Sequence, residues 1–259
     1  MSDTPVNLTI SDGIAHVELN RPDAGNAINS ALGDALSAAA RECDNNRQVR
    51  VILFSAKGKM FSVGGDLQYM SEQGDNIQTA VKLLADELHR ALTHFARCDA
   101  PIVTAVQGTA AGAGFSMAIM GDVVVAEEHA KFTMAYTASG LSPDGGSTYY
   151  LPRLIGMRRA QELTLTNRVL TAQEAHDWGL ITQVVETGKG LETARKICQK
   201  IASGSKSANA DAKRLLRTSF DNSFETHLEL EGREIAKNGA TDGREGITAF
   251  FEKRAPKFS

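Results

Sequence analysis

The sequence predicts an α/β fold built on a mainly parallel sheet. Apolar segments at 49–55, 102–106 and 122–126 are typical of buried strands, and helical patterns separate them. Strand and helix in alternation indicate parallel strands joined by helical crossovers. The pattern becomes mostly helical from Gly145 onward. We therefore expect a core at 1–200 and a helical C-terminal region at 201–259.

The first part of the chain is predicted to form a hairpin, a helix and a strand. Residues 7–10 and 14–19 are β-rich runs around the turn Ser11-Asp12-Gly13. After a break at 20–23, Ser30 is expected to cap an alanine-rich helix that ends near Asp44. A strand at 49–55, a glycine-containing loop at 59–66 and an amphipathic helix at 76–97 are predicted to follow.

The elements from residue 102 onward are predicted from shorter sequence patterns. A strand at 102–106, a small-residue turn at 108–114 and a buried helix at 115–120 are predicted before the strand at 122–126. Thr171 opens the sequence TAQE, which is a capping-box pattern at a helix start. Further helices are expected at 191–203, 205–219, 223–238 and 243–252.

The composition narrows the class of protein. The chain has 259 residues, 42% of them hydrophobic, and a net charge of −3, which argues against nucleic acid or an anionic membrane as the main partner. Cys43, Cys98 and Cys198 are dispersed, which indicates reduced thiols in a core. The N-terminal stretch lacks the pattern of a secretory signal, and no apolar run approaches the roughly 20 residues that span a bilayer. A cytoplasmic location is therefore expected.

Two glycine-containing loops follow predicted strands, at 61–67 (FSVGGDL) and 108–114 (GTAAGAG). Small residues let the backbone approach a ligand closely, and amide N–H groups at a helix start point outward toward an anion or an oxyanion. Each loop taken alone is more typical of a tight turn that needs a positive φ.

Two familiar motifs are only partly matched at the second loop. Met117 stands at the third glycine position of a dinucleotide-binding GxGxxG pattern, which argues against that fold. Residues 114–118 (GFSMA) nearly form a serine-hydrolase nucleophile elbow, with Asp144 and then His176 or His227 in the required order. Ser116 lies in an apolar run, however, where a buried helical serine that bonds its own backbone is expected.

Asp144 and His89 each have a structural and a chemical interpretation. Asp144 precedes the predicted helix near Gly145, and its segment alone favours a helix cap. The alternative is a carboxylate on an apolar loop that transfers protons. His89 lies in a helical pattern and is expected to be a partly exposed surface residue. None of the six histidines has metal-ligand spacing such as HExxH, so no metal site is predicted.

Taken together, several segments resemble the enoyl-CoA hydratase/isomerase family, also called the crotonase superfamily. They are LNRPDAGNAIN, KMFSVGGDL, APIVTAVQGTAAGAGFSMAIMGDVVVAEEHAKF, LSPDGGSTYYLPRLIGMRRAQELTLTNRVLTAQEAHDWGL and GREGITAFFEKRAPKF. The resemblance covers nearly the whole chain, in order. It implies a crotonase-type spiral of ββα units, a C-terminal helical trimerisation region, and a trimer or a dimer of trimers. It also implies an acyl-CoA thioester substrate, with coenzyme A present as part of that substrate and no separate cofactor.

The resemblance further implies which residues form the site. Its two backbone donors for the thioester oxygen fall on Gly65 and Ala113. The acyl group is expected against 70–85, and a neighbouring subunit's Lys253 or Lys257 near the CoA phosphates. Ala24-Gly25 replaces a basic residue that often contacts the adenosine phosphate. The remaining CoA contacts are expected from Ser62, Val63, Gly64, Asp66, Leu67 and Gly112.

The departures from the family pattern point to one reaction. Hydratases of the family carry two catalytic glutamates, and this chain has Ser116 and Tyr136 at those positions. Asp144 matches the aspartate of the family's isomerases, including the phenylacetate-pathway ring-opening isomerase. Because one carboxylate can serve first as base and then as acid, we expect conversion of a 3-enoyl-CoA to a 2-enoyl-CoA, and weak hydration.

Three alternatives stay open from the sequence. The first is an enoyl-CoA hydratase. The second resembles 4-chlorobenzoyl-CoA dehalogenase, with Asp144 as nucleophile, His89 as base and Tyr136 in place of that enzyme's tryptophan. The third is a non-catalytic acyl-CoA binder.

Overall fold

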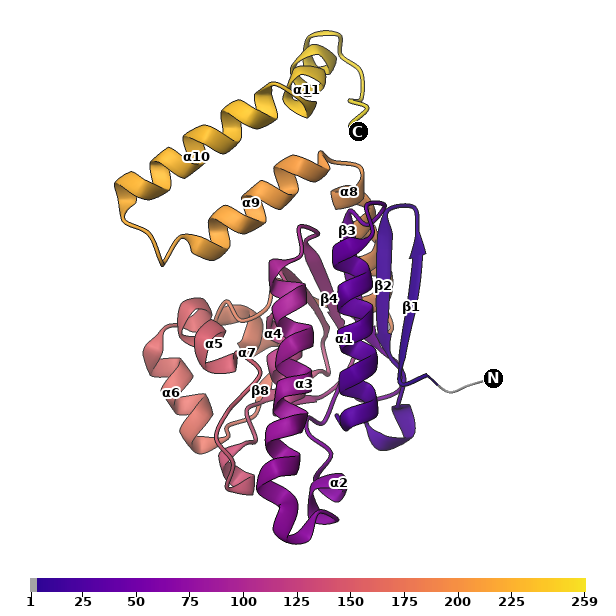
Figure 1. Cartoon of the computed structure of the whole chain (residues 1–259), viewed down its shortest axis with the longest axis vertical. Helices are drawn as coiled ribbons and strands as arrows, with labels where there is room; N and C mark the ends of the chain where they lie inside the picture. Colours follow the sequence, from indigo (N-terminus) through magenta and orange to yellow (C-terminus); the bar gives the residue numbers. More distant parts are fainter. Residues whose placement is uncertain (1–3) are drawn as a thin grey trace.

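A six-stranded sheet forms the centre of the computed structural model, which describes residues 4–259 (Figure 1). Residues 1–3 of the N-terminal stretch lie outside the described residues. The strand order is β1-β2-β3-β4-β6-β9, and only β1 and β2 pair antiparallel. The predicted α/β class with a mainly parallel sheet is therefore confirmed. The strands are β1 (Val6–Ser11), β2 (Ile14–Leu19), β3 (Val51–Ala56), β4 (Ile102–Val106), β6 (Val123–Glu127) and β9 (Gln183–Val185).

The hairpin between β1 and β2 follows from its turn. Asp12 has a φ of 52° and Gly13 a φ of 77°. Positive φ at both central residues is typical of the type I′ turn, whose twist matches that of the flanking strands. The predicted hairpin is therefore confirmed.

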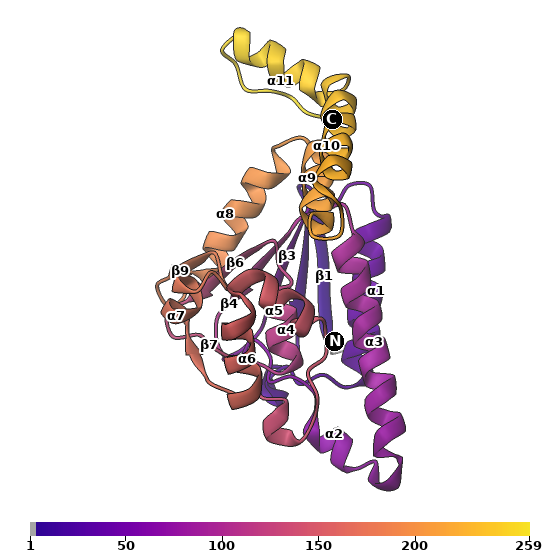
Figure 2. The ribbon, with the colours of Figure 1, turned by 90° about the vertical axis from the view of Figure 1, so that its left-hand side faces the viewer.

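Both faces of the sheet are covered by helices, which explains why its inner strands are almost entirely apolar. In β3, Ile52 and Phe54 join the core formed with α1 (Ser30–Asn45) and α3 (Ile77–Arg97). Val51 and Leu53 point to the opposite face, where they pack against α8 (Gly190–Ala202). Figure 2 shows α8 on one side of the sheet and the pair α1 and α3 on the other.

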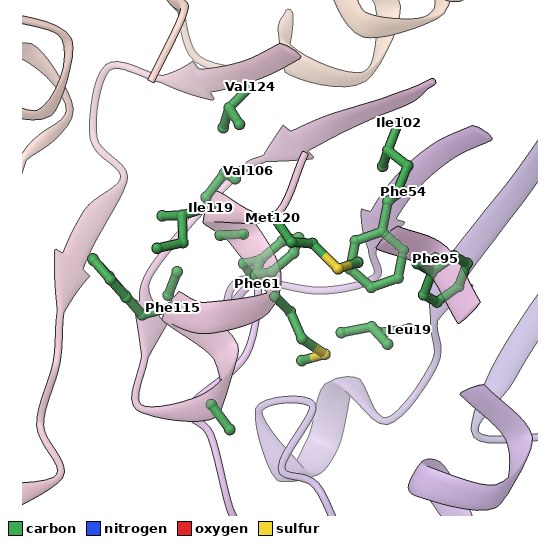
Figure 3. Packing of buried hydrophobic residues seen from close by; sticks show 14 of the residues in the cluster. Leu19, Phe54, Phe61, Phe95, Ile102, Val106, Phe115, Ile119, Met120 and Val124 are labelled. Atoms are coloured by element: carbon green, nitrogen blue, oxygen red, sulfur yellow. The ribbon is translucent and has the colours of Figure 1, made fainter. Parts of the chain in front are cut away.

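Aromatic packing holds the larger core together. The ring of Phe54 lies edge-on to Phe61 and to Phe95, with ring centroids 5.9 Å apart in both pairs (Figure 3). These pairs join β3 to the first glycine loop and to the end of α3. All three cysteines are also buried and free, as the sequence predicts.

A second, three-stranded sheet was not predicted. It has the order β5-β7-β8, with β5 (Ala110–Ala111), β7 (Lys131–Thr133) and β8 (Leu170–Thr171). Strands of two or three residues are too short to show an alternation of apolar and polar residues. The expected turn at 108–114 therefore contains β5, and the buried helix α4 (Ala113–Ile119) begins two residues earlier than predicted.

One predicted helix cap is wrong and another is confirmed. Asn29, and not Ser30, is the N-cap of α1, because the Asn29 side chain accepts a hydrogen bond from the Leu32 amide at 3.1 Å. At Thr171 the capping box forms with Glu174 as predicted. The other helices of the core are α2 (Leu67–Ser71), α5 (Ser147–Ile155), α6 (Met157–Thr166) and α7 (Ala172–Asp177), with 3-10 turns at Pro22–Ala24, Gly74–Asn76 and Thr137–Ser139.

The chain ends in three helices, α9 (Lys206–Thr218), α10 (Phe224–Gly239) and α11 (Asp242–Phe251), close to their predicted positions. They lie at the end of the molecule opposite α2 (Figure 1). The division at residue 200 into two regions stays a prediction. Within residues 4–259, no helix combines the length and apolarity needed to cross a membrane.

Candidate active site

A largely apolar cavity of about 660 Å³ lies between α2, α3 and the two glycine loops. Helices α2 and α3 supply about half of its lining residues, and the segment 70–85 borders a pocket as predicted. Gly65, Ala113 and Asp144 reach the same cavity from three separate segments. Its apolar wall includes Ile28, Val63, Leu67, Met70, Ile77, Val81, Leu84, Ala85, Leu88 and Leu141.

The two glycine loops pack directly against each other. Gly64 has a φ of 91°, and a Cβ atom there would lie 2.8 Å from the Ala111 carbonyl oxygen and 3.1 Å from the Ala113 nitrogen. Only glycine combines this φ with such a close approach. The contact places Gly65 and Ala113 side by side at the cavity.

The Gly65 and Ala113 amides are both without acceptors in the part of the chain that the structure describes. Ala113 is the first residue of α4, so the helix itself offers its N–H group no acceptor. Gly65 bridges to Ile28 only through its neighbours Gly64 and Asp66. Two unpaired amides bordering one cavity are suited to hold an oxyanion.

The close packing at Gly64 predicts that a side chain at this position destabilises the fold. We expect Gly64→Ala to lower the free energy of unfolding by about 2–5 kcal/mol, because it adds backbone strain and a clash with two backbone atoms. Gly74→Ala is the matched control, since Gly74 also has a positive φ of 53° but open space around it. Urea unfolding of both variants measures the difference, and equal losses would contradict the packing argument.

The residues predicted to contact CoA occupy different environments. Ser62 is fully buried and its Oγ donates to the Asn26 carbonyl at 2.9 Å, so its side chain supports the loop from inside. Val63 and Leu67 border the cavity with exposed side chains. Gly112 borders it through its backbone, with a φ of 54°.

The Asp66 side chain is engaged in contacts within the protein. Its Oδ1 accepts from the Tyr69 amide at 3.1 Å and so caps α2, while its Oδ2 lies 3.2 Å from Arg21 Nη1. The carboxylate therefore ties the N-terminal RP segment to the first glycine loop. Lys253 and Lys257 follow α11, which Figure 1 places far from α2, so a single chain does not bring them to the cavity.

Asp144 is not a helix cap, contrary to the interpretation that its segment favours. Gly145 and Gly146 both have positive φ, of 62° and 79°, so α5 begins only at Ser147. The N-cap is Gly146, and no side chain caps the helix. The Asp144 carboxylate instead turns to the cavity, where its Oδ1 accepts from the Tyr136 hydroxyl at 2.7 Å.

Tyr136 and Ser116 form a buried pair behind Asp144. Burial, with the neighbouring Asp144 charge, raises the pKa of Tyr136 well above its ordinary value, so its hydroxyl stays protonated as a donor. Ser116 Oγ lies 3.0 Å from the Tyr136 hydroxyl, 3.0 Å from the Asp144 carbonyl oxygen and 3.4 Å from the Gly112 carbonyl oxygen. This contact with Gly112 confirms the buried helical serine.

The nucleophile-elbow alternative is not realised. Within residues 4–259, the hydrogen-bond partners of Ser116 Oγ include no histidine, so neither His176 nor His227 can activate it. The favoured interpretation, a buried helical serine, is the one the structure confirms, because the partners of a serine are set by tertiary packing and not by a local match to GxSxG.

His89 was expected to be a partly exposed surface residue, with a catalytic role only in the dehalogenase-like alternative, and the structure places it beside Asp144. It projects from α3, and its side chain is 47% exposed. Its Nε2 accepts from the Gly145 amide at 3.1 Å and lies 3.3 Å from Asp144 Oδ2. A helical pattern gives no sign of such a contact, because Gly145 lies 56 residues further along the chain.

Met70 is a site residue whose specific place the sequence did not indicate. A Cβ atom on Gly65 would lie 2.6 Å from Met70 Cε, so the methyl group of Met70 covers Gly65 at the cavity. Asp144 is the one carboxylate among the described residues that line the cavity. Residues 4–259 contain no group of three or more His, Cys, Asp or Glu side chains that could hold a metal ion.

Comparison with known proteins shows which family this chain resembles. The model of the family "Enoyl-CoA hydratase/isomerase" matches residues 9–259. The 1,2-epoxyphenylacetyl-CoA isomerase of Escherichia coli K12 is 32% identical over 96% of each chain. The trans-2-decenoyl-[acyl-carrier-protein] isomerase of Streptococcus mutans is 30% identical, again over 96% of each chain. The crystal structure of an enoyl-CoA hydratase from Polaromonas sp. JS666 superposes with a TM-score of 0.94 at 30% identity, and the match covers 98% of this chain and 99% of that one.

Proposed function

This chain belongs to the enoyl-CoA hydratase/isomerase family and has the crotonase fold, and from that premise we propose that it isomerises a 3-enoyl-CoA to a 2-enoyl-CoA. Membership makes it an acyl-CoA enzyme. The choice of isomerase rests on one observation, which is that Asp144 is the one carboxylate among the described residues that line the cavity.

Asp144 performs both proton transfers in this proposal. Its carboxylate removes a proton from carbon 2 of the acyl group, and the electrons move onto the thioester oxygen as a dienolate. Asp144 then returns the proton to carbon 4, which leaves the double bond conjugated with the thioester. No other acid is required, because the base of the first step is the acid of the second.

Gly65 and Ala113 stabilise the dienolate through their unpaired amides. The charge on the oxygen develops during the reaction, so donors already in place favour the transition state over the substrate. Tyr136 supports the base differently. Its hydroxyl donates a hydrogen bond to Asp144 Oδ1 at 2.7 Å. Oδ2 is therefore the oxygen that removes the proton from the substrate. The CoA moiety runs along the first glycine loop, past Val63 and Leu67.

Hydration is disfavoured by the residues that flank Asp144. Addition of water needs groups that orient the water and relay its proton. Ser116 and Tyr136 stand where hydratases of this family have glutamates, and both are buried and bonded to each other or to Asp144. Neither can supply a second carboxylate.

The absorbance of the conjugated enoyl thioester tests the proposal directly. We expect it to rise when the purified protein meets 3-hexenoyl-CoA, and to stay constant with 2-hexenoyl-CoA. A fall with the second substrate would mean hydration and would contradict our interpretation of Ser116 and Tyr136. If neither substrate reacts and a halobenzoyl-CoA is hydrolysed, the dehalogenase-like alternative with Asp144 and His89 replaces the isomerase.

We also propose that the chain assembles as a homotrimer or a dimer of trimers. Helices α9 to α11 expose an unusual number of large apolar side chains, and such surfaces are typical of subunit contacts. Assembly of this kind would bring Lys253 of one subunit toward the cavity of another. The exposed residues are Leu216, Phe220, Phe224, Leu228, Ile235, Ile247, Phe250 and Phe251.

The assembly has its own prediction. We expect Phe250→Asp to shift the protein toward monomers in light scattering, because a charge at an apolar contact is desolvated without a partner. Leu165→Asp is the matched control, since Leu165 on α6 is exposed to a similar degree but lies outside α9 to α11. The same mass for both variants and the native protein would contradict the proposed contact.

A further inference from the structure

The wall of the cavity continues beyond Asp144 along one face of α3. His89 marks the level of Asp144 on that helix, since its Nε2 lies 3.3 Å from Asp144 Oδ2. From there toward the start of α3, apolar residues that line the cavity recur at helical spacing, so they form one continuous stripe. At 1.5 Å per residue, the stretch from His89 to Val81 is about 12 Å long. The stripe consists of Leu88, Ala85, Leu84, Val81 and Ile77.

The proposed reaction fixes where an acyl chain enters this stripe. Carbon 4 must lie at Asp144, because it receives its proton there, so only the atoms beyond carbon 4 can run along α3. An extended chain with bonds of about 1.5 Å advances about 1.3 Å per carbon, and about eight further carbons therefore reach Val81. An acyl group of four carbons would end at Asp144 and leave the stripe without the dispersion contacts of a filled apolar space.

The charges around the cavity favour an acyl chain with a plain methyl end. Besides Asp144, Lys82 is the one charged residue among the described residues that line the cavity. Its ammonium group is paired with Asp86, one turn later on α3. Ile77, at the far end of the stripe, is 46% exposed, so the cavity opens to solvent there. Among the described lining residues, no unpaired charge is therefore left to bind a charged group at the end of the chain.

We propose that the stripe is a subsite for straight acyl chains of about ten carbons or more and that Ala85 determines this preference, an inference that rests on the proposed isomerase function. Ala85 has the smallest side chain of the stripe and lies one turn from His89, where the chain leaves Asp144. Its neighbours Leu84 and Leu88 are buried, whereas Ala85 is partly exposed at the cavity. The small side chain leaves the room through which a long acyl chain passes.

Turnover of two chain lengths tests the subsite. We expect kcat/KM of the native protein to be about 100-fold or more higher for 3-dodecenoyl-CoA than for 3-hexenoyl-CoA, because each buried methylene gives about a fourfold gain. Ala85→Leu is expected to reduce this ratio by about 10- to 100-fold, since leucine occupies the space of the longer chain. Thr79→Leu is the matched control and should keep the native ratio, because Thr79 is exposed on the same helix and does not line the cavity.

Binding of saturated acyl-CoAs separates the subsite from the reaction. In calorimetry, the native protein is expected to bind dodecanoyl-CoA about 100-fold or more tightly than hexanoyl-CoA, and Ala85→Leu should remove most of this difference. Equal affinities, equal kcat/KM for the two enoyl substrates, or a native ratio in Ala85→Leu would overturn the subsite. If dodecanoyl-CoA binds more tightly but neither enoyl substrate yields a 2-enoyl product, the isomerase proposal alone fails, so the two failures are distinguishable.

Discussion

Asp144→Asn is expected to lower kcat for 3-enoyl-CoA isomerisation by about 10²- to 10⁴-fold, the range typical of a lost general base. Asparagine keeps the shape of the side chain and can still accept from the Tyr136 hydroxyl, which donates to Asp144 Oδ1 at 2.7 Å. It cannot take a proton from carbon 2. The loss should therefore appear in kcat, measured from the conjugated-enoyl absorbance.

The fold of Asp144→Asn should be unaffected, because the Asp144 side chain caps no helix. Thermal unfolding and acyl-CoA affinity provide the two checks. Ser142→Ala is a suitable control, since Ser142 lines the same cavity two residues away and has no role in the proton transfers. Undiminished turnover in Asp144→Asn would remove Asp144 from the mechanism. If the native protein has no activity, and Asp144→Asn binds acyl-CoA with the same affinity as the native protein, the non-catalytic binder is favoured.

Ala113→Pro is expected to lower kcat by about 10²- to 10³-fold, which is the usual effect of removing one oxyanion donor. The substitution deletes the N–H group itself, which a side-chain change cannot do. Ala113 is the first residue of α4, where proline is well tolerated because its missing N–H has no partner in the helix. The result separates a backbone role from a side-chain role at this position.

The control for Ala113→Pro is Ala113→Ser, which keeps the amide and adds only a hydroxyl group beside the cavity. We expect the serine variant to stay within about tenfold of the native kcat, since a well-placed donor remains. Urea unfolding should show that both variants are folded. Equal activity of the proline variant and the native protein would rule out Ala113 as a donor.

Some features of the molecule could be predicted from the residues alone because their causes are local or periodic. The apolar run of β3 indicates a strand covered on both faces, and the Asp12-Gly13 turn needs positive φ. The family resemblance located the two glycine loops and Asp144 by position. The short strands β5 and β8 could not be predicted, because two residues show no alternation.

Other features depend on contacts between distant segments. Whether Gly64 is merely a turn residue or a contact point was decided by Ala111 and Ala113, which pack against it from the second loop. Ser116 matched a catalytic motif locally, yet its actual neighbours are Gly112, Tyr136 and Asp144. His89 has an unremarkable helical context and gains its contact with Asp144 only because α3 crosses the loop before α5.

By itself, the sequence determined the α/β class, the order of the main elements and the presence of an acidic residue before α5, since these follow from periodicity, composition and position. Only the tertiary structure decided what that residue contacts. A cap is selected by local backbone geometry, and two glycines with positive φ delay the start of α5 until Ser147. The freed carboxylate then takes its partners from α3 and from Tyr136, because packing brings those groups within hydrogen-bond distance.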